Sequence, residues 1–179
     1  AFRPRARLLA LLGEQLIDNA RLAVFEMVKN AYDADANGVK ITLRDPDKAE
    51  GTISVKDDGT GMTLETITDI WLEPGTDNRE KQRESGKRSE KYRRLRLGEK
   101  GVGRFAAHKL GNQIKLWTRA KGGPELHVSI TWSDQIDHRY MDETSVIVEQ
   151  GDGSHFTSKK TGTHIEVSQL KTEWTRGDV

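Results

Sequence analysis

The sequence predicts an α+β sandwich, in which helices and strands are largely segregated along the chain. The first part of the 179-residue chain shows helical periodicity, whereas the part after residue 112 contains four segments in which apolar and polar residues alternate. Alternation with a period of two is typical of strands, and hairpin-length turns join these segments. Helices that come first and strands that come mostly later favour an α+β fold over a βαβ alternation.

The composition is that of a soluble and rather polar globular protein. Hydrophobic residues make up 34% of the chain and charged residues 32%, and the net charge is +1. Cysteine is absent, which excludes disulfides and thiolate chemistry. No apolar run approaches the roughly 18 residues of a membrane span, and no signal peptide is visible. We expect a cytoplasmic location, or a nuclear one in a eukaryote, and no membrane partner.

The ends of the chain suggest a piece of a larger protein. The first residue is Ala1 instead of methionine, and the last residues form the charged run KTEWTRGDV. We therefore expect residues 1–179 to be a single domain excised from a longer chain. This length is sufficient for one domain with its own hydrophobic core.

The first half of the chain is expected to contain three helices and two strands. Residues 5–16 form an amphipathic helix candidate, and Asp18 or Asn19 can cap a second helix that Gly38 ends. The remaining elements, in chain order, are a strand over 39–45, a turn at 46–51, a strand over 51–59 and a helix over 63–72.

The middle of the chain, residues 74–97, is rich in charged and small residues and has no periodic apolar face. A segment of this length without regular structure inside a compact domain is typical of a functional lid or of disorder. A glycine-rich loop over 97–103 then leads into a short helix that Gly111 closes. Strands are expected after it, over 113–119, 126–132, 144–150 and 162–169.

The second helix carries a polar stripe. Glu26, Asn30 and Asp33 stand at i, i+4 and i+7, which stacks two carboxylates and an amide on one face. A solvated face is the simpler interpretation, but the same helix carries apolar residues that look suited to a core: Phe25, Val28 and Tyr32. A covered carboxylate needs a partner. Near a triphosphate, Glu26 could act as general base and Asn30 could offer its oxygen to magnesium.

The stretch DDGTGM, residues 57–62, follows the second expected strand. Asp and Gly are common turn formers, so a plain β-turn is one interpretation. In the other, Asp57 accepts a hydrogen bond from an exocyclic amine, and Gly59 and Gly61 let the backbone before Met62 pass close to a flat ring. A carboxylate in this role selects adenine over guanine, which carries a carbonyl group at that position.

Two further stretches contain glycine motifs. The box GEKGVG at 98–103 spaces its glycines as G-x-x-G-x-G, which is neither a P-loop nor the dinucleotide fingerprint. It could be a flexible loop; because it leads into a helix, its amides could instead bind phosphate, with Lys100 and Arg104 adding positive charge. The stretch TGTHIEV at 161–167 reads as a hairpin entering a strand, and Thr163 is a candidate hydroxyl for a base or for a water beside it.

Taken in this order, the four stretches resemble the GHKL ATPases, which include gyrase, the heat-shock chaperone, histidine kinases, MutL and MORC. That family carries an E-x-x-x-N helix motif, then D-x-G-x-G, then a G-x-x-G-x-G box beyond a mobile lid, and a late Gly-Thr. The resemblance spans roughly residues 8 to 168. Asp33 stands where the family is often acidic, and the matching residues are Glu26, Asn30, Asp57, Gly59, Gly61, Gly98, Gly101, Gly103, Gly162 and Thr163.

The resemblance implies the Bergerat fold, a mixed but mostly antiparallel sheet with helices on one face and ATP held between helices and lid. By carry-over, Glu26 is the general base, Asn30 the magnesium ligand and Asp57 the adenine reader. ATP and Mg²⁺ are the implied cofactors. The other residues implied to contact the nucleotide are Asp33, Gly59, Gly61, Met62, Gly98, Lys100, Gly101, Val102, Gly103, Arg104 and Thr163.

The resemblance leaves three functions open. The chain could be the ATP-hydrolysing domain of a larger ATP-driven protein, with a lid that closes over ATP and favours a homodimer. It could be a nucleotide-gated interaction module with negligible hydrolysis, or a histidine-kinase-type catalytic domain. The third box, GEKGVGRFAAHKLG, is similar to the chaperone, MutL and MORC style more than to the kinase style.

Two expectations concern partners. Hydrolysing members of the family use a Lys from a following, transducer-like domain, so we expect this chain alone to hydrolyse ATP weakly. The lid is basic toward its end, which would allow contact with ATP phosphates, a second subunit or nucleic acid. Tyr92 is its only aromatic residue, so stacking on single strands has no support from the sequence.

Overall fold

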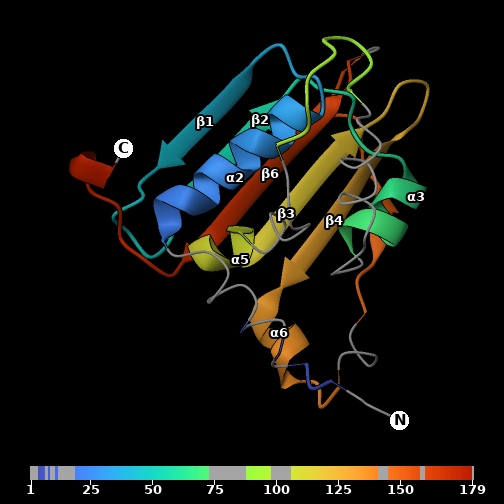
Figure 1. Cartoon of the computed structure of the whole chain (residues 1–179). Helices are drawn as coiled ribbons and strands as arrows, with labels where there is room; N and C mark the ends of the chain where they lie inside the picture. The colour runs from blue at the N-terminus through green and yellow to red at the C-terminus, as the bar shows by residue number, and fades with distance from the viewer. Residues whose placement is uncertain are drawn as a thin grey trace.

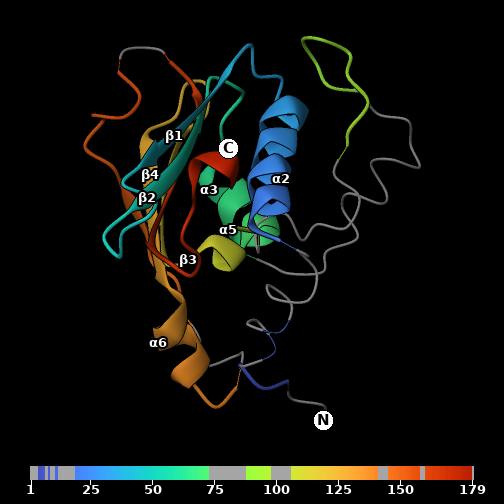
Figure 2. The same ribbon diagram turned by 90° about the vertical axis from the view of Figure 1, so that its left-hand side faces the viewer.

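The computed structural model describes residues 4–6, 8, 11, 19–72, 88–97, 106–140, 145–157 and 160–178. These residues form two layers, a sheet and a set of helices on one of its faces (Figure 1). In the view turned by 90°, the strands lie on one side, and α2 (Ala20–Asp33), α3 (Leu64–Thr66) and α5 (Ala106–Leu110) lie together on the other (Figure 2). The expected α+β sandwich with helices on one face is confirmed.

The sheet has six strands in the order β1-β2-β6-β3-β4-β5. Every pairing among these strands is antiparallel, so the parallel pair of a mixed sheet is not found in the part of the chain that the structure describes. The strands are β1 (Val39–Arg44), β2 (Thr52–Asp57), β3 (Gly111–Arg119), β4 (Glu125–Thr131), β5 (Val148–Gln150) and β6 (Gly162–Leu170).

The last strand of the chain, β6, lies between β2 and β3 and joins the two halves of the sheet (Figure 1). Ile53, Val167 and Ile114 are paired in one row across these three strands, and all three side chains are buried. They belong to the same core as Met27 of α2 and Leu110 of α5. Burial of this row therefore fixes the register that aligns the ends of the three strands, because a slip by one residue would turn these side chains away from the core.

Helix α2 begins at Ala20 and is capped by Asn19, whose side chain accepts a hydrogen bond from the backbone N–H of Leu22 at 3.0 Å. It ends at Asp33, five residues before the expected end at Gly38. Its buried face consists of small or slender residues at a spacing of four: Ala23, Met27 and Ala31. The core role expected for Phe25 and Tyr32 is wrong, because both point away from that face and are 56% and 37% exposed.

Several other boundaries differ from the expected ones. The helix expected over 63–72 is a short α3 capped by Thr63, followed by a π-helical turn, η1 (Ile67–Trp71). The strand expected over 126–132 stops at Thr131, where an unpredicted helix, α6 (Trp132–Asp137), begins. Most of the helix expected over 5–16 lies outside the described residues. A short 3-10 helix, η4 (Arg176–Asp178), follows the last strand.

No helix in the described ranges has both the length and the apolar character needed to cross a membrane.

Candidate functional site

The ends of three neighbouring strands bring Asp57, Thr163 and Thr118 together. Thr118 of β3 is paired with Thr163 of β6 in the sheet register. On the other side of β6, the pairing of β2 ends at Lys56 and His164, and Asp57 is the next residue of β2. The backbone N–H of Thr163 donates to the Asp57 Oδ1 at 3.2 Å. Two of the sequence motifs, separated by about a hundred residues, thus meet at one sheet end.

The Asp57 carboxylate is held by backbone donors and is largely shielded from solvent. Its Oδ1 also accepts from the N–H of Gly59 at 2.8 Å, while no donor of the described residues contacts Oδ2. Burial raises the pKa of Asp57 to about 6, against the opposing effect of the two backbone hydrogen bonds, and the neighbouring Asp58 charge adds to the rise. A poorly solvated carboxylate with an open oxygen is suited to accept a hydrogen bond from a ligand N–H.

The loop after Asp57 is fixed against the protein backbone on both sides. The N–H of Thr60 donates to the carbonyl of Ala34 at 2.8 Å, at the end of α2. Gly61 has a φ of +67°, and a Cβ on it would lie 2.0 Å from the carbonyl oxygen of Arg119. The glycine requirement here therefore comes from close packing on β3.

Met62 continues this loop toward β3. Its backbone N–H donates to the Thr118 Oγ1 at 2.9 Å, and the same Oγ1 lies 2.9 Å from the carbonyl oxygen of Gly162. Gly162 has a φ of +144°, and a Cβ there would meet the Asp57 carbonyl at 2.2 Å. The loop, the end of β3 and the start of β6 are thus held in contact at one buried hydroxyl.

The polar stripe of α2 is half-buried along its whole length. Glu26 accepts from Lys29 Nζ at 2.8 Å, and both side chains of this ion pair are mostly shielded, with 25% and 20% exposed. Asn30 lies one turn after Glu26 on the same face. The stripe is therefore not a freely solvated surface, and Lys29 holds the Glu26 carboxylate in one orientation.

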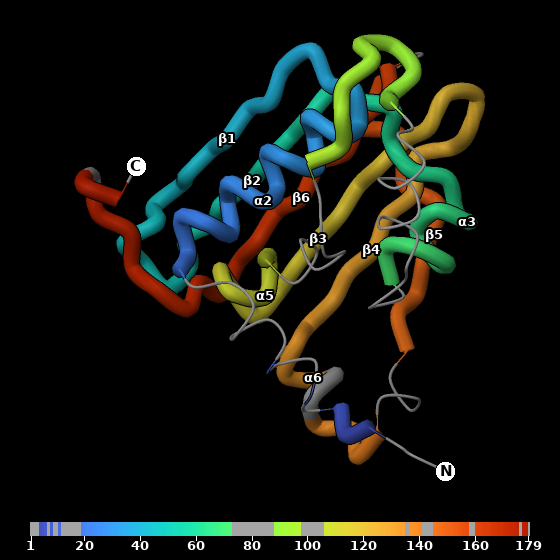
Figure 3. The backbone as a smooth tube through the Cα atoms, in the orientation of Figure 1, coloured from blue at the N-terminus to red at the C-terminus, as the bar shows by residue number. Residues whose placement is uncertain are grey.

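Asp33, the third member of the stripe, is engaged by the second half of the expected lid. Its Oδ1 accepts from the backbone N–H of Leu97 at 2.8 Å. Figure 3 shows the yellow-green segment 88–97 running beside the end of α2. The position expected to contact the nucleotide thus anchors the chain immediately before the glycine box.

The segment 88–97 is held on the end of α2 chiefly by Arg94. Its guanidinium donates to the carbonyls of Tyr32 and Ala36 at 3.1 and 3.0 Å and lies over the rings of Tyr32 and Tyr92 at 4.5 and 4.4 Å. The Lys91 N–H also donates to the buried Asp35 carboxylate at 2.8 Å. Cationic donors are favoured at the carbonyl end of a helix.

Asp35 is the buried acidic residue at the contact between the segment 88–97 and the end of α2. Burial acts to raise the pKa of Asp35, but the hydrogen bonds from Ser89, Lys91 and Tyr92 and the Arg94 charge outweigh it, so the pKa lies below its usual value. Asp35 is therefore a buried charged group that the segment 88–97 covers, with the Lys91 N–H bonded to Oδ2 and no hydrogen-bond partner for Oδ1 among the described residues.

The described residues fit a magnesium ion that is bound together with phosphate, but they do not form a metal site made of protein ligands alone. No group of three or more histidine, aspartate or glutamate side chains that could hold a metal ion occurs in the described ranges. The half-buried Asn30 amide beside Glu26 does not provide a full set of protein ligands for a metal ion. It does fit an ion that arrives on phosphate, because Mg²⁺ typically takes one or two protein oxygens and completes its shell with phosphate and water.

Part of the predicted site lies outside the described residues. These positions are the glycine box and the basic residues within and after it, namely Gly98, Lys100, Gly101, Val102, Gly103 and Arg104, together with residues 74–87 of the lid. The helix α5 that follows the box is described, and it packs against α2.

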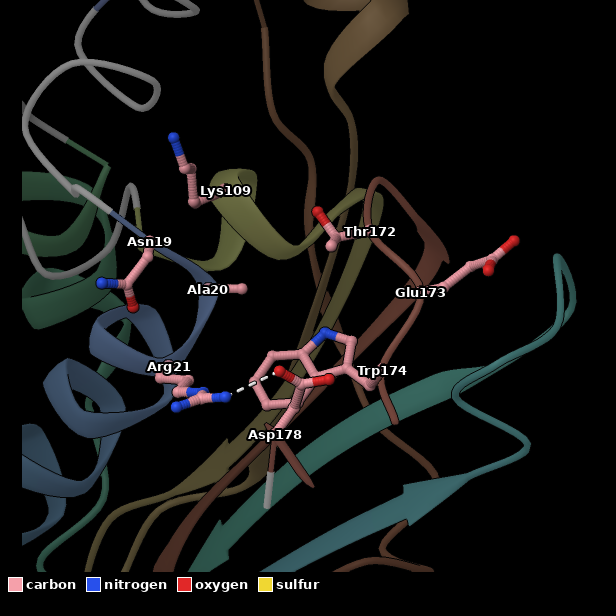
Figure 4. Close-up of a pocket in the computed structure, with 8 residues that line it drawn as sticks. All are labelled: Asn19, Ala20, Arg21, Lys109, Thr172, Glu173, Trp174 and Asp178. Carbon is pink, nitrogen blue, oxygen red and sulfur yellow. Dashed lines mark hydrogen bonds and ion pairs between the residues drawn. The ribbon is translucent and has the colours of Figure 1, made fainter. Parts of the chain in front are cut away.

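A pocket of about 500 Å³ lies at the other end of α2 (Figure 4). The first residues of α2 form one wall, and the chain after β6 forms another, with the Arg21 guanidinium paired to Asp178 at 2.8 Å. Lys109 and Glu173 bring one further charge of each sign, so the lining charges balance. None of the predicted site residues lines this pocket.

Comparison with known proteins places this arrangement in context. A family model described as histidine kinase-, DNA gyrase B- and HSP90-like ATPase matches residues 18–163. The chaperone protein HtpG of Mycobacterium bovis (strain BCG / Pasteur 1173P2) is 24% identical over 193 residues, which cover 97% of this chain and 29% of that protein. HtpG of Mycolicibacterium vanbaalenii is 25% identical over 197 residues, which cover 97% of this chain and 30% of that protein.

A relative of another kind is also similar. The putative type II restriction enzyme HgiDII of Herpetosiphon aurantiacus is 26% identical over 160 residues, covering 89% of this chain and 24% of that protein. The chain spans about a quarter to a third of the length of these relatives.

Proposed function

The chain belongs to the family of histidine kinase-, DNA gyrase B- and HSP90-like ATPases, and from this premise we propose that it binds ATP with Mg²⁺ and hydrolyses the γ-phosphate. The observation that supports this best is the Asp57 carboxylate, fixed through Oδ1 by two backbone donors while Oδ2 has no described donor. In this proposal, Oδ2 accepts from the exocyclic amine of adenine. The amine of adenine is a donor where guanine has an acceptor, so the contact selects ATP.

At the phosphate end, Glu26 takes the proton of the attacking water. Its ion pair with Lys29, at 2.8 Å, engages Oε1, and Oε2 would be the oxygen that takes the proton. Asn30 supplies the protein oxygen for Mg²⁺, which would neutralise phosphate charge. Lys100, Arg104 and the amides of the glycine box hold the phosphates, and positioning and charge supply most of the rate.

Asp33 takes a second role beside the expected nucleotide contact. Through its 2.8 Å bond to the Leu97 N–H it sets where the glycine box begins. Binding of ATP then stabilises a closed lid, which favours a homodimer. In this proposal, a following transducer-like domain supplies a lysine that completes the phosphate site, and the chain alone hydrolyses ATP weakly.

Phosphate release from Mg²⁺–ATP by the intact protein tests the proposal. Glu26→Gln should abolish release and leave ATP binding by calorimetry within about threefold, because Gln keeps the shape but is not a base. Glu65→Gln on the exposed start of α3 is the matched control and should release phosphate normally. Normal turnover in Glu26→Gln would remove Glu26 from its role.

The same assay separates the other two functions. A protein that binds ATP but releases no more phosphate than Glu26→Gln would be a nucleotide-gated interaction module. Label from γ-³²P-ATP on a histidine of a partner, in place of free phosphate, would indicate a kinase.

A further inference from the structure

The Thr118 side chain links the two nucleotide motifs at the described sheet end. Thr118 lies on β3, outside every motif in the sequence, and its side chain is fully buried. Its Oγ1 has three partners: the Met62 N–H at 2.9 Å, the Gly162 carbonyl oxygen at 2.9 Å and the Thr163 Oγ1 at 3.1 Å. The first belongs to the loop after Asp57, and the other two belong to the Gly-Thr motif.

The chemistry of these partners fixes the direction of every hydrogen bond. A hydroxyl has one proton and two lone pairs. The Gly162 carbonyl can only accept, so it takes the Thr118 proton. The Met62 N–H can only donate, so it uses one Thr118 lone pair. The contact between the two hydroxyls then requires the Thr163 O–H to donate to the remaining Thr118 lone pair.

This direction determines what Thr163 offers to a ligand. With its proton committed to Thr118, the Thr163 oxygen has only lone pairs left. Its own backbone N–H donates to the Asp57 Oδ1 at 3.2 Å, so the carboxylate and the residue that carries this hydroxyl are neighbours at the strand ends. Both groups are hydrogen-bond acceptors, and a partner that is also an acceptor would be repelled by both.

We propose that Thr118 is a positioning residue for base specificity, which orients the Thr163 hydroxyl so that the site takes a 6-aminopurine and rejects a 6-oxopurine. The inference rests on the proposed function, because it concerns the base end of the same site. Asp57 alone could discriminate, but a freely rotating Thr163 hydroxyl could donate to the 6-oxo group and offset that discrimination. Thr118 removes this possibility.

The test compares the β,γ-imido analogues of ATP and ITP by calorimetry on the intact protein with Mg²⁺. The two bases differ at position 6, which carries an amine or an oxygen, and at N1, which carries a proton only in ITP. The measured quantity is the ratio of the two dissociation constants. Thr118→Val, which keeps the shape without the hydroxyl, should lower the preference for ATP about tenfold, the value of one hydrogen bond. Thr118→Ser should restore the preference. A general loss of packing would weaken both ligands equally and leave the ratio unchanged.

Since Thr118→Val buries an unpaired Met62 N–H, it could prevent folding. Thr163→Ala tests the same claim at a half-buried position, with Thr163→Ser as the matched rescue. The inference expects Thr163→Ala to lose preference for ATP and Thr163→Ser to keep it. An unchanged ratio in Thr163→Ala overturns the inference and leaves the proposed function in place. Equal binding of both analogues by the unaltered protein overturns the inference and also contradicts adenine selection by Asp57. Absence of any nucleotide binding contradicts the proposed function as well.

Discussion

The backbone N–H of Thr163 donates to the Oδ1 of Asp57 at 3.2 Å, although the two residues are 106 positions apart in the chain. The contact exists because β6, the last strand, inserts between β2 and β3. The carboxylate that is proposed to bind the base is therefore held in this position only when the final strand is in place. This hydrogen bond can form only when β2, β6 and β3 are paired in the observed register.

Asp57→Asn should weaken ATP binding about 10- to 100-fold, since a charge-assisted hydrogen bond contributes about 1.5–3 kcal/mol. Asn can still accept from Gly59 and Thr163 through its oxygen, so the fold is preserved. Calorimetry with Mg²⁺–ATP measures the change. Asp58→Asn is the control: Asp58 is exposed and accepts from Asn37 and Gly38, and its substitution should leave affinity nearly unchanged. Equal affinity in Asp57→Asn would exclude the assigned role.

ATP affinity should also fall as the pH drops through about 6. Burial raises the pKa of Asp57 to about 6, so below that value the carboxyl is increasingly protonated in the free protein and loses its charge as an acceptor. Each unit of pH below the pKa should cost up to about tenfold in affinity. Titrations between about pH 5 and 8, with Asp57→Asn measured in parallel, isolate this group from the titration of the phosphates. A ratio of the two proteins' ATP affinities that does not change with pH would contradict the prediction.

The same pKa predicts a stability effect in the absence of nucleotide. Because the folded-state pKa of Asp57 lies above the ordinary 3.8, the folded protein binds a proton more readily than the unfolded chain. The stabilisation is present below about pH 4 and is lost as the pH rises through about 6. Asp57→Asn should therefore be more stable than the unaltered protein at pH 7.5, by on the order of 1 kcal/mol, and this advantage should vanish near pH 4. Thermal melts at both pH values check this.

Gly61→Ala should destabilise the protein by more than Gly122→Ala. Both glycines have positive φ, +67° and +78°, so an alanine is strained at either position. Only at Gly61 would the added Cβ also meet backbone, at 2.0 Å from the Arg119 carbonyl oxygen, whereas Gly122 has open space around it. We expect a loss of about 1 kcal/mol at Gly122 and at least twice that at Gly61 by urea unfolding. Equal losses would show that the loop can move off β3.

Arg94→Ala should release the segment 88–97 from α2. The substitution removes two hydrogen bonds to the helix end and the cation–π contacts of the guanidinium with the rings of Tyr32 and Tyr92. Limited proteolysis should then cut this segment several-fold faster, because cleavage follows local opening. Arg96→Ala is the matched control, since Arg96 is exposed, and it should be cut at the normal rate. Protection that is the same in both variants would mean that Asp33 and Asp35 hold the segment without Arg94.

Much of this arrangement could be predicted from the sequence because its signals are local. The spacing of Glu26 and Asn30 on one helix, and of Asp57 and its glycines after one strand, is readable without knowing the fold. The face of α2 that packs on the sheet could not be predicted in this way, because Ala23 and Ala31 are less hydrophobic than Phe25 and Tyr32. Small residues face the sheet because they allow the helix to lie close to it.

The residues that sequence reasoning missed depend on long-range register. Thr118 is a core-facing residue of an ordinary strand pattern, and it acquires a role only because β3 pairs with β6 at Thr163. Arg94 is one cation among many in a charged segment, and its partners are carbonyls that only the folded helix end presents. Lys29 had a usable signal, since it lies three residues after Glu26 on the same helix.

A crystal structure of the intact protein with Mg²⁺ and a non-hydrolysable ATP analogue tests the central claim most directly. The base should lie at the ends of β2 and β6, with its exocyclic amine within about 3 Å of the Asp57 Oδ2. A base bound elsewhere, or an Asp57 that keeps only its bonds to Gly59 and Thr163 while nucleotide is bound, would contradict the account.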